Sequence, residues 1–247
     1  MKNEAIISIR DFTMKFGNHT VIENLNFEVL RGETFGLLGS NGSGKTTTLR
    51  ALLGMYIPTS GSLLINGKKY SVEKGGKLGY LPEERGLYKK EAVLNTMVYF
   101  GELKGMNRLD AQKWSIDYLK RVGLSNKTNQ KIDQLSGGQQ QKVQLGVTII
   151  NNPELLILDE PTKGLDPMNR RLLMEIIEEH QKSGATVIFV THQMEEVERL
   201  CDRIILLKDG KAAVYGTIKE IKKQFDNKSL DDIFISIYGN NEDIKYA

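Results

Sequence analysis

A glycine-rich run that ends in lysine and threonine has the clearest chemical meaning in this sequence. Residues 39–46, GSNGSGKT, match the pattern GxxxxGK[ST], in which glycines let backbone N–H groups wrap a phosphate chain. A helix starting here adds the positive end of its dipole. We expect Lys45 to hold the β- and γ-phosphates and the Thr46 hydroxyl to bind Mg²⁺. The predicted nucleotide site comprises Gly39, Ser40, Asn41, Gly42, Ser43, Gly44, Lys45, Thr46 and Thr47.

Two adjacent carboxylates follow a short apolar run. Residues 155–158 are typical of a buried strand, and Asp159 and Glu160 come directly after them. Open α/β sheets bind ligands at the carboxyl ends of their strands. We therefore expect Asp159 to bind Mg²⁺, directly or through water, and Glu160 to polarise the attacking water as general base. The alternative is an Asp-Glu-Pro turn that only ends a strand.

A second glycine-rich segment, LSGGQ at residues 135–139, precedes an expected helix. Ser136, Gly137, Gly138 and Gln139 would expose N–H groups and a hydroxyl there, which makes a second anion site. One phosphate loop already serves one nucleotide, so the second site has a use if it faces the nucleotide of another subunit. The alternative is an ordinary serine N-cap with a flexible approach.

Hydrophobic periodicity indicates the elements that must position these residues. An apolar run at 33–39 enters the glycine loop, and residues 46–53 behind it have helical spacing. Alternation within residues 12–29 predicts antiparallel strands. Apolar runs at 155–159 and 186–191, separated by a helical stretch, predict a mostly parallel sheet covered on both faces.

These elements predict an α/β fold, with a P-loop NTPase core that contains a parallel sheet. The core and an antiparallel β subdomain are expected over residues 1–82 and 151–216. Helical spacing favours an inserted helical subdomain over residues 83–150. Residues 217–247 are expected to form a C-terminal helical extension, where Thr217 and Glu220 have the spacing of a capping box.

Composition excludes several classes of protein. With 247 residues, 40% hydrophobic and 26% charged, the chain fits neither a disordered protein nor a disulfide scaffold. The single cysteine, Cys201, favours a reducing cytoplasmic setting. A net charge of +3 gives no ground for expecting nucleic acid as a partner. No segment approaches the roughly 20 apolar residues that span a bilayer, so any membrane association is expected to come through a partner.

Together, and in this order, the three motifs resemble those of the ATP-binding subunit of an ABC transporter. LSGGQ combined with GxxxxGK[ST] and LLILDEP is highly specific to that family, and the resemblance covers nearly the whole chain. It implies an ATPase that uses ATP and Mg²⁺ and dimerises around two ATP molecules, as a homodimer or a heterodimer. It also implies a separate multi-helix transmembrane permease, which would hold the chain at the cytoplasmic face of the membrane.

The resemblance implies roles for three further residues. Phe16 takes the place of an aromatic side chain that stacks on adenine, although a half-buried strand aromatic is the alternative, since Phe12 and Met14 share its alternation. His192 matches a switch histidine that contacts the γ-phosphate and orders the attacking water. Asp166 lies in a segment similar to the loop by which one subunit senses the site of the other.

Glu83 departs from the family pattern, which usually has glutamine at this position after a strand. A carboxylate could bind Mg²⁺ more strongly than an amide does, or it could repel Asp159 and Glu160. An ordinary solvated loop is the third possibility. The surrounding LPEERGLY, residues 81–88, is similar to the branch that exports sodium, drugs and antibiotics, which favours export.

Residues 84–98 carry more apolar area than a surface helix needs for its own core. By the resemblance, the corresponding groove receives a short cytoplasmic helix of the permease, with Arg85 and Tyr88 as contacts. The alternative is that residues 87–98 bury themselves against Trp114 and Tyr118.

Two other functions stay open from the sequence. A soluble ABC ATPase of the iron–sulfur cluster assembly type also has one cassette and this length. A nucleotide-sensing regulator without turnover is disfavoured, because both Asp159 and Glu160 are present.

Overall fold

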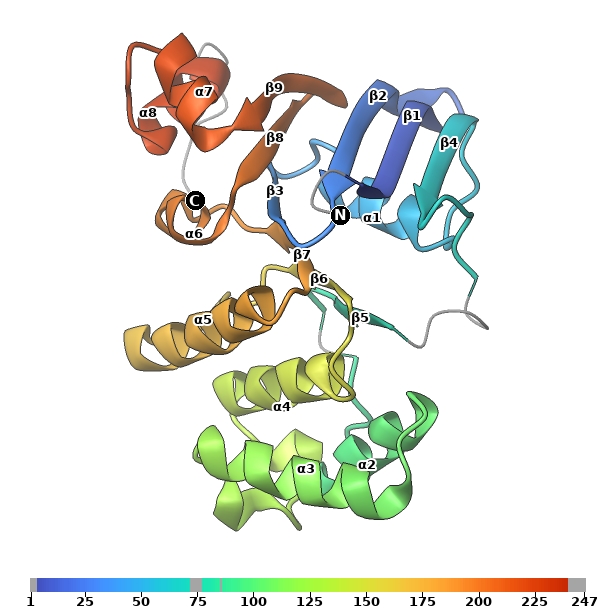
Figure 1. Ribbon diagram of the computed structural model, residues 1–247, viewed down its shortest axis with the longest axis vertical. Coiled ribbons are helices and arrows are strands. Elements are labelled where there is room, and N and C mark those ends of the chain that lie inside the picture. Colours follow the sequence, from blue (N-terminus) through green and yellow to red (C-terminus); the bar gives the residue numbers. More distant parts are fainter. Residues whose placement is uncertain (1–3, 72–76, 85, 240–247) are drawn as a thin grey trace. The chain divides into compact units, whose positions relative to one another are not determined.

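The computed structural model describes residues 4–71, 77–84 and 86–239 of the chain. It divides into two compact units: unit 1 is Met1–Ser71 with Ile188–Ala247, and unit 2 is Val72–Val187. Figure 1 labels the elements of each unit. The predicted subdomain boundaries, at residues 82/83, 150/151 and 216/217, follow the sequence motifs and stay predictions.

Unit 1 contains an antiparallel sheet of three strands in the order β2-β1-β4 (Figure 1). The strands are β1 (Ala5–Phe16), β2 (His19–Leu30) and β4 (Ser60–Ile65). Phe12 and Met14 point into the core of this unit, as the alternation of period two requires. The predicted antiparallel strands are thus confirmed.

The strand before the glycine loop is buried along its whole length. This strand, β3 (Thr34–Gly39), pairs in parallel with β8 (Arg203–Lys208), which pairs antiparallel with β9 (Lys211–Thr217). Asp209 and Gly210 both have positive φ in the β8–β9 turn, the geometry expected of an Asp-Gly hairpin. Helix α1 (Lys45–Leu52) follows the loop, as the periodicity predicts.

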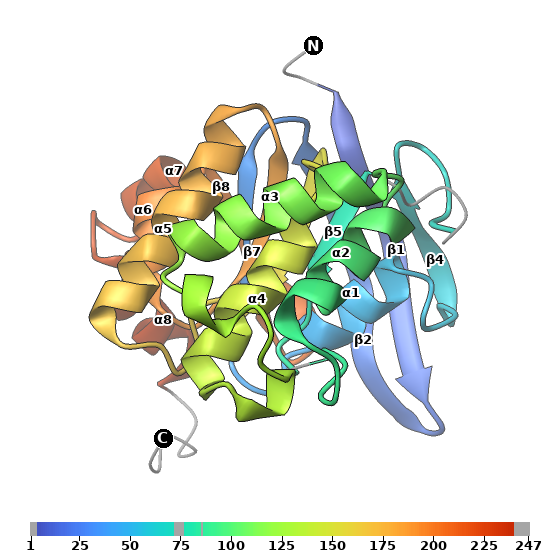
Figure 2. The same cartoon turned by 90° about the horizontal axis from the view of Figure 1, so that it is seen from below.

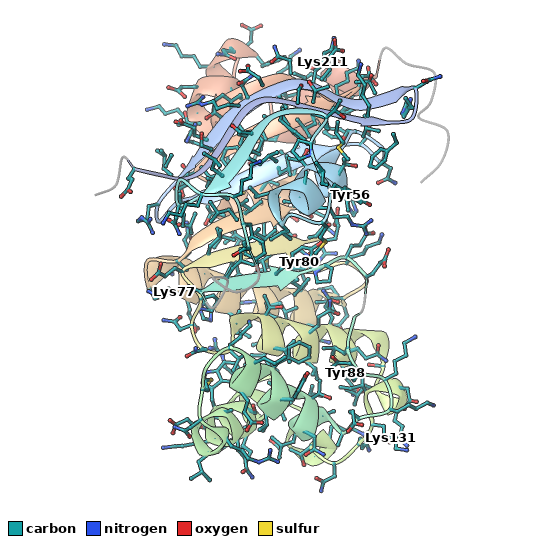
Figure 3. All side chains as sticks on the ribbon, turned by 90° about the vertical axis from the view of Figure 1, so that its right-hand side faces the viewer. Tyr56, Lys77, Tyr80, Tyr88, Lys131 and Lys211 are labelled. Atoms are coloured by element: carbon teal, nitrogen blue, oxygen red, sulfur yellow. The ribbon has the colours of Figure 1, made fainter. Side chains whose placement is uncertain are left out.

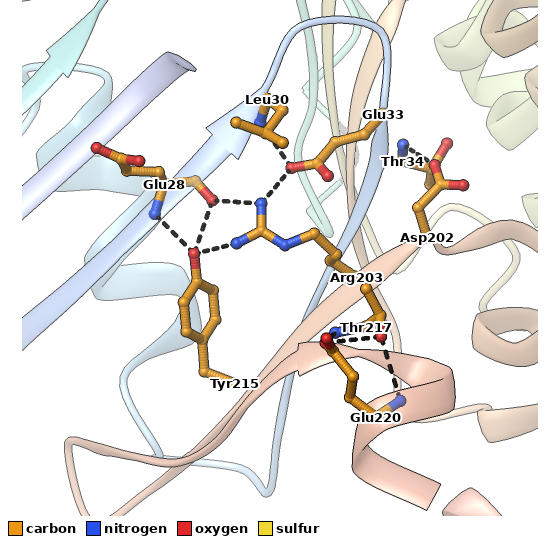
Figure 4. Close-up of polar contacts among 9 residues, drawn as sticks. All are labelled: Glu28, Leu30, Glu33, Thr34, Asp202, Arg203, Tyr215, Thr217 and Glu220. Atoms are coloured by element: carbon orange, nitrogen blue, oxygen red, sulfur yellow. Dashed lines mark hydrogen bonds and ion pairs between the residues drawn. The ribbon is translucent and has the colours of Figure 1, made fainter. Parts of the chain in front are cut away.

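A polar network around Arg203 connects the two strand systems of unit 1 (Figure 4). The Arg203 guanidinium donates to Glu33 Oε1 at 3.2 Å and to the Glu28 carbonyl at 3.4 Å, and it also bonds the Tyr215 hydroxyl. Burial raises the pKa of the Glu33 carboxyl, an effect that hydrogen bonding to Leu30 and the charge of Arg203 partly offset. These bonds hold β2 against β8 and β9.

Three helices complete unit 1: α6 (Met194–Leu200), α7 (Ile218–Gln224) and α8 (Leu230–Tyr238). Helix α7 starts with the capping box expected from its sequence. The Thr217 hydroxyl accepts the Glu220 N–H at 3.2 Å, and Glu220 Oε2 accepts the Thr217 N–H at 3.0 Å. Helices α7 and α8 lie within the C-terminal extension expected from the sequence, whose bounds stay a prediction.

Unit 2 combines strands with a group of packed helices (Figure 2). Strand β5 (Leu78–Leu81) pairs in parallel with β6 (Leu155–Asp159), α5 (Pro167–Lys182) follows, and the unit boundary falls within β7 (Thr186–Val190). The helices predicted over residues 83–150 are α2 (Val93–Leu103), α3 (Arg108–Arg121) and α4 (Gly137–Ile149), with 3₁₀ turns at Ser125–Lys127 and Ile132–Gln134.

A glycine in α4 permits close packing of the helices in unit 2. A Cβ at Gly146 would lie 2.5 Å from Tyr118 Cε1 and 2.8 Å from Met97 Cε, which is closer than side-chain carbons approach. Tyr118 itself stacks on Trp114 with ring centroids 5.1 Å apart. Met97 therefore belongs to the core of this unit.

The observed strands and helices confirm the predicted α/β class, with one mixed sheet that contains parallel pairs and one antiparallel sheet. None of the helices described between residues 4 and 239 is both long enough and apolar enough to cross a membrane.

Candidate nucleotide site

The P-loop, residues 39–46, is packed too closely for side chains at two of its glycines. Gly39 has φ +151°, and a Cβ there would overlap Ser43 Oγ and lie 2.7 Å from the Leu207 carbonyl oxygen. Gly44 has φ +103°, and a Cβ there would overlap Cδ1 of Ile22. Both positions need glycine, because a side chain at either of them would clash with neighbouring atoms. The conformation of this loop therefore depends on its glycine backbone.

Polar groups of the P-loop suit an anion. The ammonium of Lys45 donates to the carbonyls of Gly39 at 2.7 Å and Ser40 at 2.9 Å. No side chain caps the start of α1, because its N-cap is Gly44. The Ser43 hydroxyl is buried and has no hydrogen-bond partner among the residues described. A glycine cradle, an ammonium group and an uncapped helix start together fit a phosphate chain.

Phe16 lies at the end of β1 with 46% of its surface exposed, whereas Phe12 and Met14 are buried. Its ring contacts Tyr56 edge-on, with centroids 5.4 Å apart; Tyr56 is labelled in Figure 3. The ring is thus accessible, as stacking on a base requires. Its role with adenine stays a prediction.

His192 is exposed and lies in the short loop between β7 and α6, in the same unit as the P-loop. The neighbouring Thr191 shapes this loop, because its hydroxyl accepts the Gln193 N–H at 3.2 Å. The loop follows the strand end, where the sequence predicted it.

Asp159 and Glu160 belong to unit 2 and are largely buried, with 2% and 8% of their surface exposed. Glu160 has φ +51°, a left-handed conformation that is uncommon outside glycine and that clusters at functional sites. Gln141 on α4 donates to the Pro161 carbonyl at 2.9 Å, which ties the end of this segment to α4. The backbone around the two carboxylates is therefore tightly held.

Glu83 forms an ion pair with Lys163, with Nζ and Oε1 2.7 Å apart. This hydrogen bond raises the pKa of Lys163, and the nearby charges of Glu160 and Asp159 raise it further. Sequence reasoning missed Lys163, although a lysine three residues after Glu160 was a visible signal. The ammonium of Lys163 counters the repulsion that Glu83 would otherwise exert on the two buried carboxylates.

The loop that carries Glu83 is also tied to α4. Gln144 Nε2 donates to the carbonyls of Pro82 and Glu84, both at 3.2 Å. The residues on either side of Glu83 are thus anchored to the helix that the LSGGQ segment begins.

The LSGGQ segment starts α4 with a complete capping box. The Ser136 hydroxyl accepts the Gln139 N–H at 3.3 Å, and the Gln139 side chain accepts the Ser136 N–H at 3.0 Å. Gly138 packs near Leu165, since a Cβ there would lie 3.3 Å from Leu165 Cδ2. Ser136 is an N-cap, as the alternative interpretation of the sequence required, and its use as an anion site stays a prediction.

Asp166 is the N-cap of α5. Its carboxylate accepts the Asn169 N–H at 3.0 Å, and this hydrogen bond is the main cause that lowers the pKa of Asp166. The structure thus places this exposed carboxylate in its charged form at the start of a helix.

Two side chains, one in each unit, carry oxygen donors of the kind that Mg²⁺ prefers. In the part of the chain that the structure describes, no group of three or more His, Cys, Asp or Glu residues could hold a metal ion. Thr46, in the first turn of α1, and Asp159, at the end of β6, offer one hydroxyl and one carboxylate. Mg²⁺ is usually bound by one or two protein oxygens together with phosphates and water.

A family model described as ABC transporter matches residues 22–163. The chain therefore belongs to the ABC transporter family, in the class of its ATP-binding proteins. An uncharacterized ABC transporter ATP-binding protein of Methanocaldococcus jannaschii is 50% identical over 216 residues, which are 87% of this chain and 79% of that protein.

A Nod factor export ATP-binding protein I of Cupriavidus metallidurans is also similar. It is 34% identical over 239 residues, which are 96% of this chain and 78% of that protein. A solved ATP-binding subunit of an ABC transporter is 28% identical and superposes with a TM-score of 0.86, covering 94% of this chain and 99% of its own.

These likenesses confirm the family and the fold class that the motifs predicted. The chain is a transport-coupled ATPase that binds ATP. The names of its relatives favour this activity over that of a soluble ATPase without a transporter.

Proposed function

We propose that two copies of the ATP-binding fold, one of them this chain, close around two ATP molecules and so power export by a separate membrane subunit. The observation that carries this proposal is the presence of two different glycine-rich helix starts, the P-loop and the LSGGQ segment. One phosphate chain needs one cradle, so the second start is used by the nucleotide of the other subunit. The name of the similar Nod factor export protein supports export as the direction.

In the P-loop, the backbone of residues 39–47 binds the phosphates. Lys45 exchanges its two carbonyl partners for the β- and γ-phosphates, and Phe16 stacks on adenine with its exposed ring. Thr46 and Asp159 hold Mg²⁺, which when bound neutralises charge on the phosphate oxygens.

Glu160 acts as general base on the attacking water. Its left-handed backbone is a strained conformation that the surrounding structure must enforce, and such strain is frequent where a side chain must be aimed at a substrate. His192 contacts the γ-phosphate and orders the same water. Asp166 senses the site across the dimer.

At the second site, Ser136, Gly137, Gly138 and Gln139 bind the γ-phosphate of the partner's ATP. The serine hydroxyl and the N–H groups of the first turn of α4 are the donors. Binding there requires the Ser136–Gln139 capping bonds to be replaced by bonds to phosphate.

The surface that docks the membrane subunit is smaller than the apolar residues of 84–98 predict. Leu87, Val93, Met97 and Val98 are buried in unit 2, as the alternative interpretation required. Tyr88 remains 52% exposed, forms an edge-on contact with Tyr99 and is labelled in Figure 3. Arg85 lies outside the described residues. We take Tyr88 and Tyr99 as the docking surface, through which the chain is held at the cytoplasmic face of the membrane.

Replacing the general base tests the catalytic part of the proposal. Glu160→Gln should bind ATP but lower steady-state phosphate release at least 100-fold, because an amide cannot accept the proton of the water. The variant should accumulate as an ATP-bound dimer in size-exclusion chromatography. Glu102→Gln, which removes a surface carboxylate of the same unit, should behave as wild type. Wild-type hydrolysis by Glu160→Gln would exclude Glu160 as the base.

Removing the exposed tyrosine tests the docking surface. Tyr88→Ala should leave ATP binding by the isolated chain unchanged and abolish co-purification with the proposed transmembrane permease when the two are co-expressed. Leu109→Ala, which removes another exposed apolar side chain of unit 2, is the matched control and should co-purify normally. Normal co-purification of Tyr88→Ala would place the docking surface elsewhere.

A further inference from the structure

The C-terminal helix α8 reaches the P-loop through its last residue. The Tyr238 hydroxyl accepts a hydrogen bond from the Ser40 N–H at 3.0 Å and donates one to the Leu207 carbonyl. Leu207 is the β8 residue that pairs with Gly39, at the point where the loop leaves β3. One phenol therefore joins the start of the phosphate loop to the neighbouring strand.

Ser40 is consequently held at both of its backbone polar groups. Tyr238 takes its N–H, and the ammonium of Lys45 takes its carbonyl at 2.9 Å. When Lys45 turns to the phosphates of ATP, the Ser43 N–H still donates to the Ser40 carbonyl at 3.2 Å, and Tyr238 still holds the Ser40 N–H.

The phenol of Tyr238 is itself fixed by the packing of α8. Its ring contacts Phe234 with centroids 4.5 Å apart, and Lys208 Nζ lies 5.8 Å from its centroid. Lys208 also donates to the Ile237 carbonyl at 2.5 Å, next to Tyr238 in the chain. The hydroxyl thus acts from a rigid position.

The other end of α8 contacts the helix that follows His192. The Leu230 N–H donates to Glu198 Oε1 of α6 at 3.2 Å, and the same oxygen pairs with Lys222 of α7 at 2.8 Å. Leu230 and Ile233 bury their side chains along α8 between these ends. The helix therefore spans from the P-loop to α6.

We propose that Tyr238 is a positioning residue for ATP binding, and that α8 acts as a strap that holds the start of the P-loop. With Ser40 restrained, less conformational freedom is lost when the loop receives a triphosphate, so the affinity is higher. The inference rests on ATP binding by the P-loop and adds to it a residue far along the chain.

Tyr238→Phe tests the inference, because it keeps the ring and its contacts and removes only the hydroxyl. The Kd for ATP, from equilibrium titration with a fluorescent ATP analogue and competition by ATP, should rise about five-fold, as expected if the backbone freedom of one residue must now be lost on binding. KM should rise by a similar factor, and kcat at saturating ATP should stay within about two-fold, since Tyr238 does not touch the reacting atoms.

Tyr215→Phe is the matched control. It removes a hydroxyl of the same unit that bonds Arg203 and Glu28 and does not contact the P-loop. Its Kd and KM should equal those of wild type, even if its stability falls.

If Tyr238→Phe folds poorly, Lys208→Met provides the test. It removes the bond to the Ile237 carbonyl, next to Tyr238, and should raise the Kd and KM for ATP. Where both variants fold, their combination should add little, because both act through the same hydroxyl. Unchanged Kd and KM in Tyr238→Phe, or in Lys208→Met where Tyr238→Phe does not fold, would overturn the inference, as would an equal weakening in Tyr215→Phe. Failure of the wild-type chain to bind ATP would instead refute the proposed function.

Discussion

Two glycine-rich segments begin helices in this chain, and they do so in opposite ways. The P-loop enters α1 through Gly44, at φ +103°, and no side chain caps the helix. The LSGGQ segment enters α4 through Ser136, at φ −62°, and its hydroxyl and the Gln139 side chain complete a capping box. The first helix start has no side-chain cap, whereas the second is capped by its own side chains.

This difference indicates that the two segments bind phosphate under different conditions. A loop whose donors are not used by its own side chains is ready to bind phosphate in the isolated chain. A helix start that is capped by its own side chains must break those bonds before it binds a phosphate. Its net gain in binding free energy is therefore small until a second subunit brings a nucleotide against it. The affinity for ATP should therefore depend on the P-loop, whereas the rate of ATP hydrolysis should depend on both segments.

The largest difference between the two segments is expected in ATP affinity when one glycine of each is replaced by alanine. Gly44→Ala places a Cβ on Ile22 Cδ1 at a φ that only glycine adopts easily, so ATP affinity should fall more than 100-fold in equilibrium titration. Gly138→Ala meets only Leu165 at 3.3 Å and should bind ATP like wild type while hydrolysing it more slowly. Comparable ATP affinity in the two variants would break the comparison.

Removing the serine cap should have the next largest effect. Ser136→Ala should lower ATP hydrolysis about 30-fold, as expected for loss of one hydrogen bond to a charged phosphate oxygen, and leave ATP affinity unchanged. Losing the cap should also lower the free energy of unfolding by about 1 kcal/mol. Thr217→Ala removes a comparable capping box from α7 and should show only the loss of stability. A parallel loss of hydrolysis in that control would indicate a general effect of stability.

The free energy of unfolding should depend on pH through Lys104, which bonds to the last turn of α4. Lys104 donates to the carbonyls of Val147 and Thr148 at 2.8 Å and 2.6 Å, and burial lowers the pKa of its ammonium to about 8. Above that pH the unfolded chain binds more protons than the folded chain, up to the unfolded pKa of about 10.4. The free energy of unfolding should therefore rise with pH in this window, by roughly 1 kcal/mol between pH 8 and pH 9.

Chemical denaturation at several pH values measures this slope. Lys104→Met should flatten it, and Lys120→Met, on the surface of α3, should keep it. A slope that survives in Lys104→Met would assign the pH dependence to another group.

The smallest effect is expected at Glu83, whose loop is tied to α4. Glu83→Gln should keep ATP hydrolysis within about three-fold of wild type, because in the proposed site Thr46 and Asp159 hold Mg²⁺ without Glu83, and an amide can still accept a hydrogen bond from Lys163. A Mg²⁺ titration of both proteins provides the measurement. Collapse to the level of Glu160→Gln would show that the carboxylate is an essential ligand or base.

The sequence by itself determined the family, the fold class and most of the local structure. GSNGSGKT, LSGGQ and LLILDEP identified the family from residue types and spacing, and the capping box at Thr217 was predicted correctly. Such features are predictable because caps, turns and amphipathic stripes depend on residues within about one turn of each other.

Only the tertiary structure decided which residues meet across long stretches of chain. The Glu83–Lys163 pair joins residues 80 positions apart, and the Ser40–Tyr238 bond joins residues 198 apart. Met97 and Tyr88 belong to the same apolar stretch of the sequence, yet the structure buries Met97 and leaves Tyr88 half exposed. The physical reason is that burial and long-range hydrogen bonding depend on how whole elements pack, and a local pattern states which face is apolar but not what will cover it.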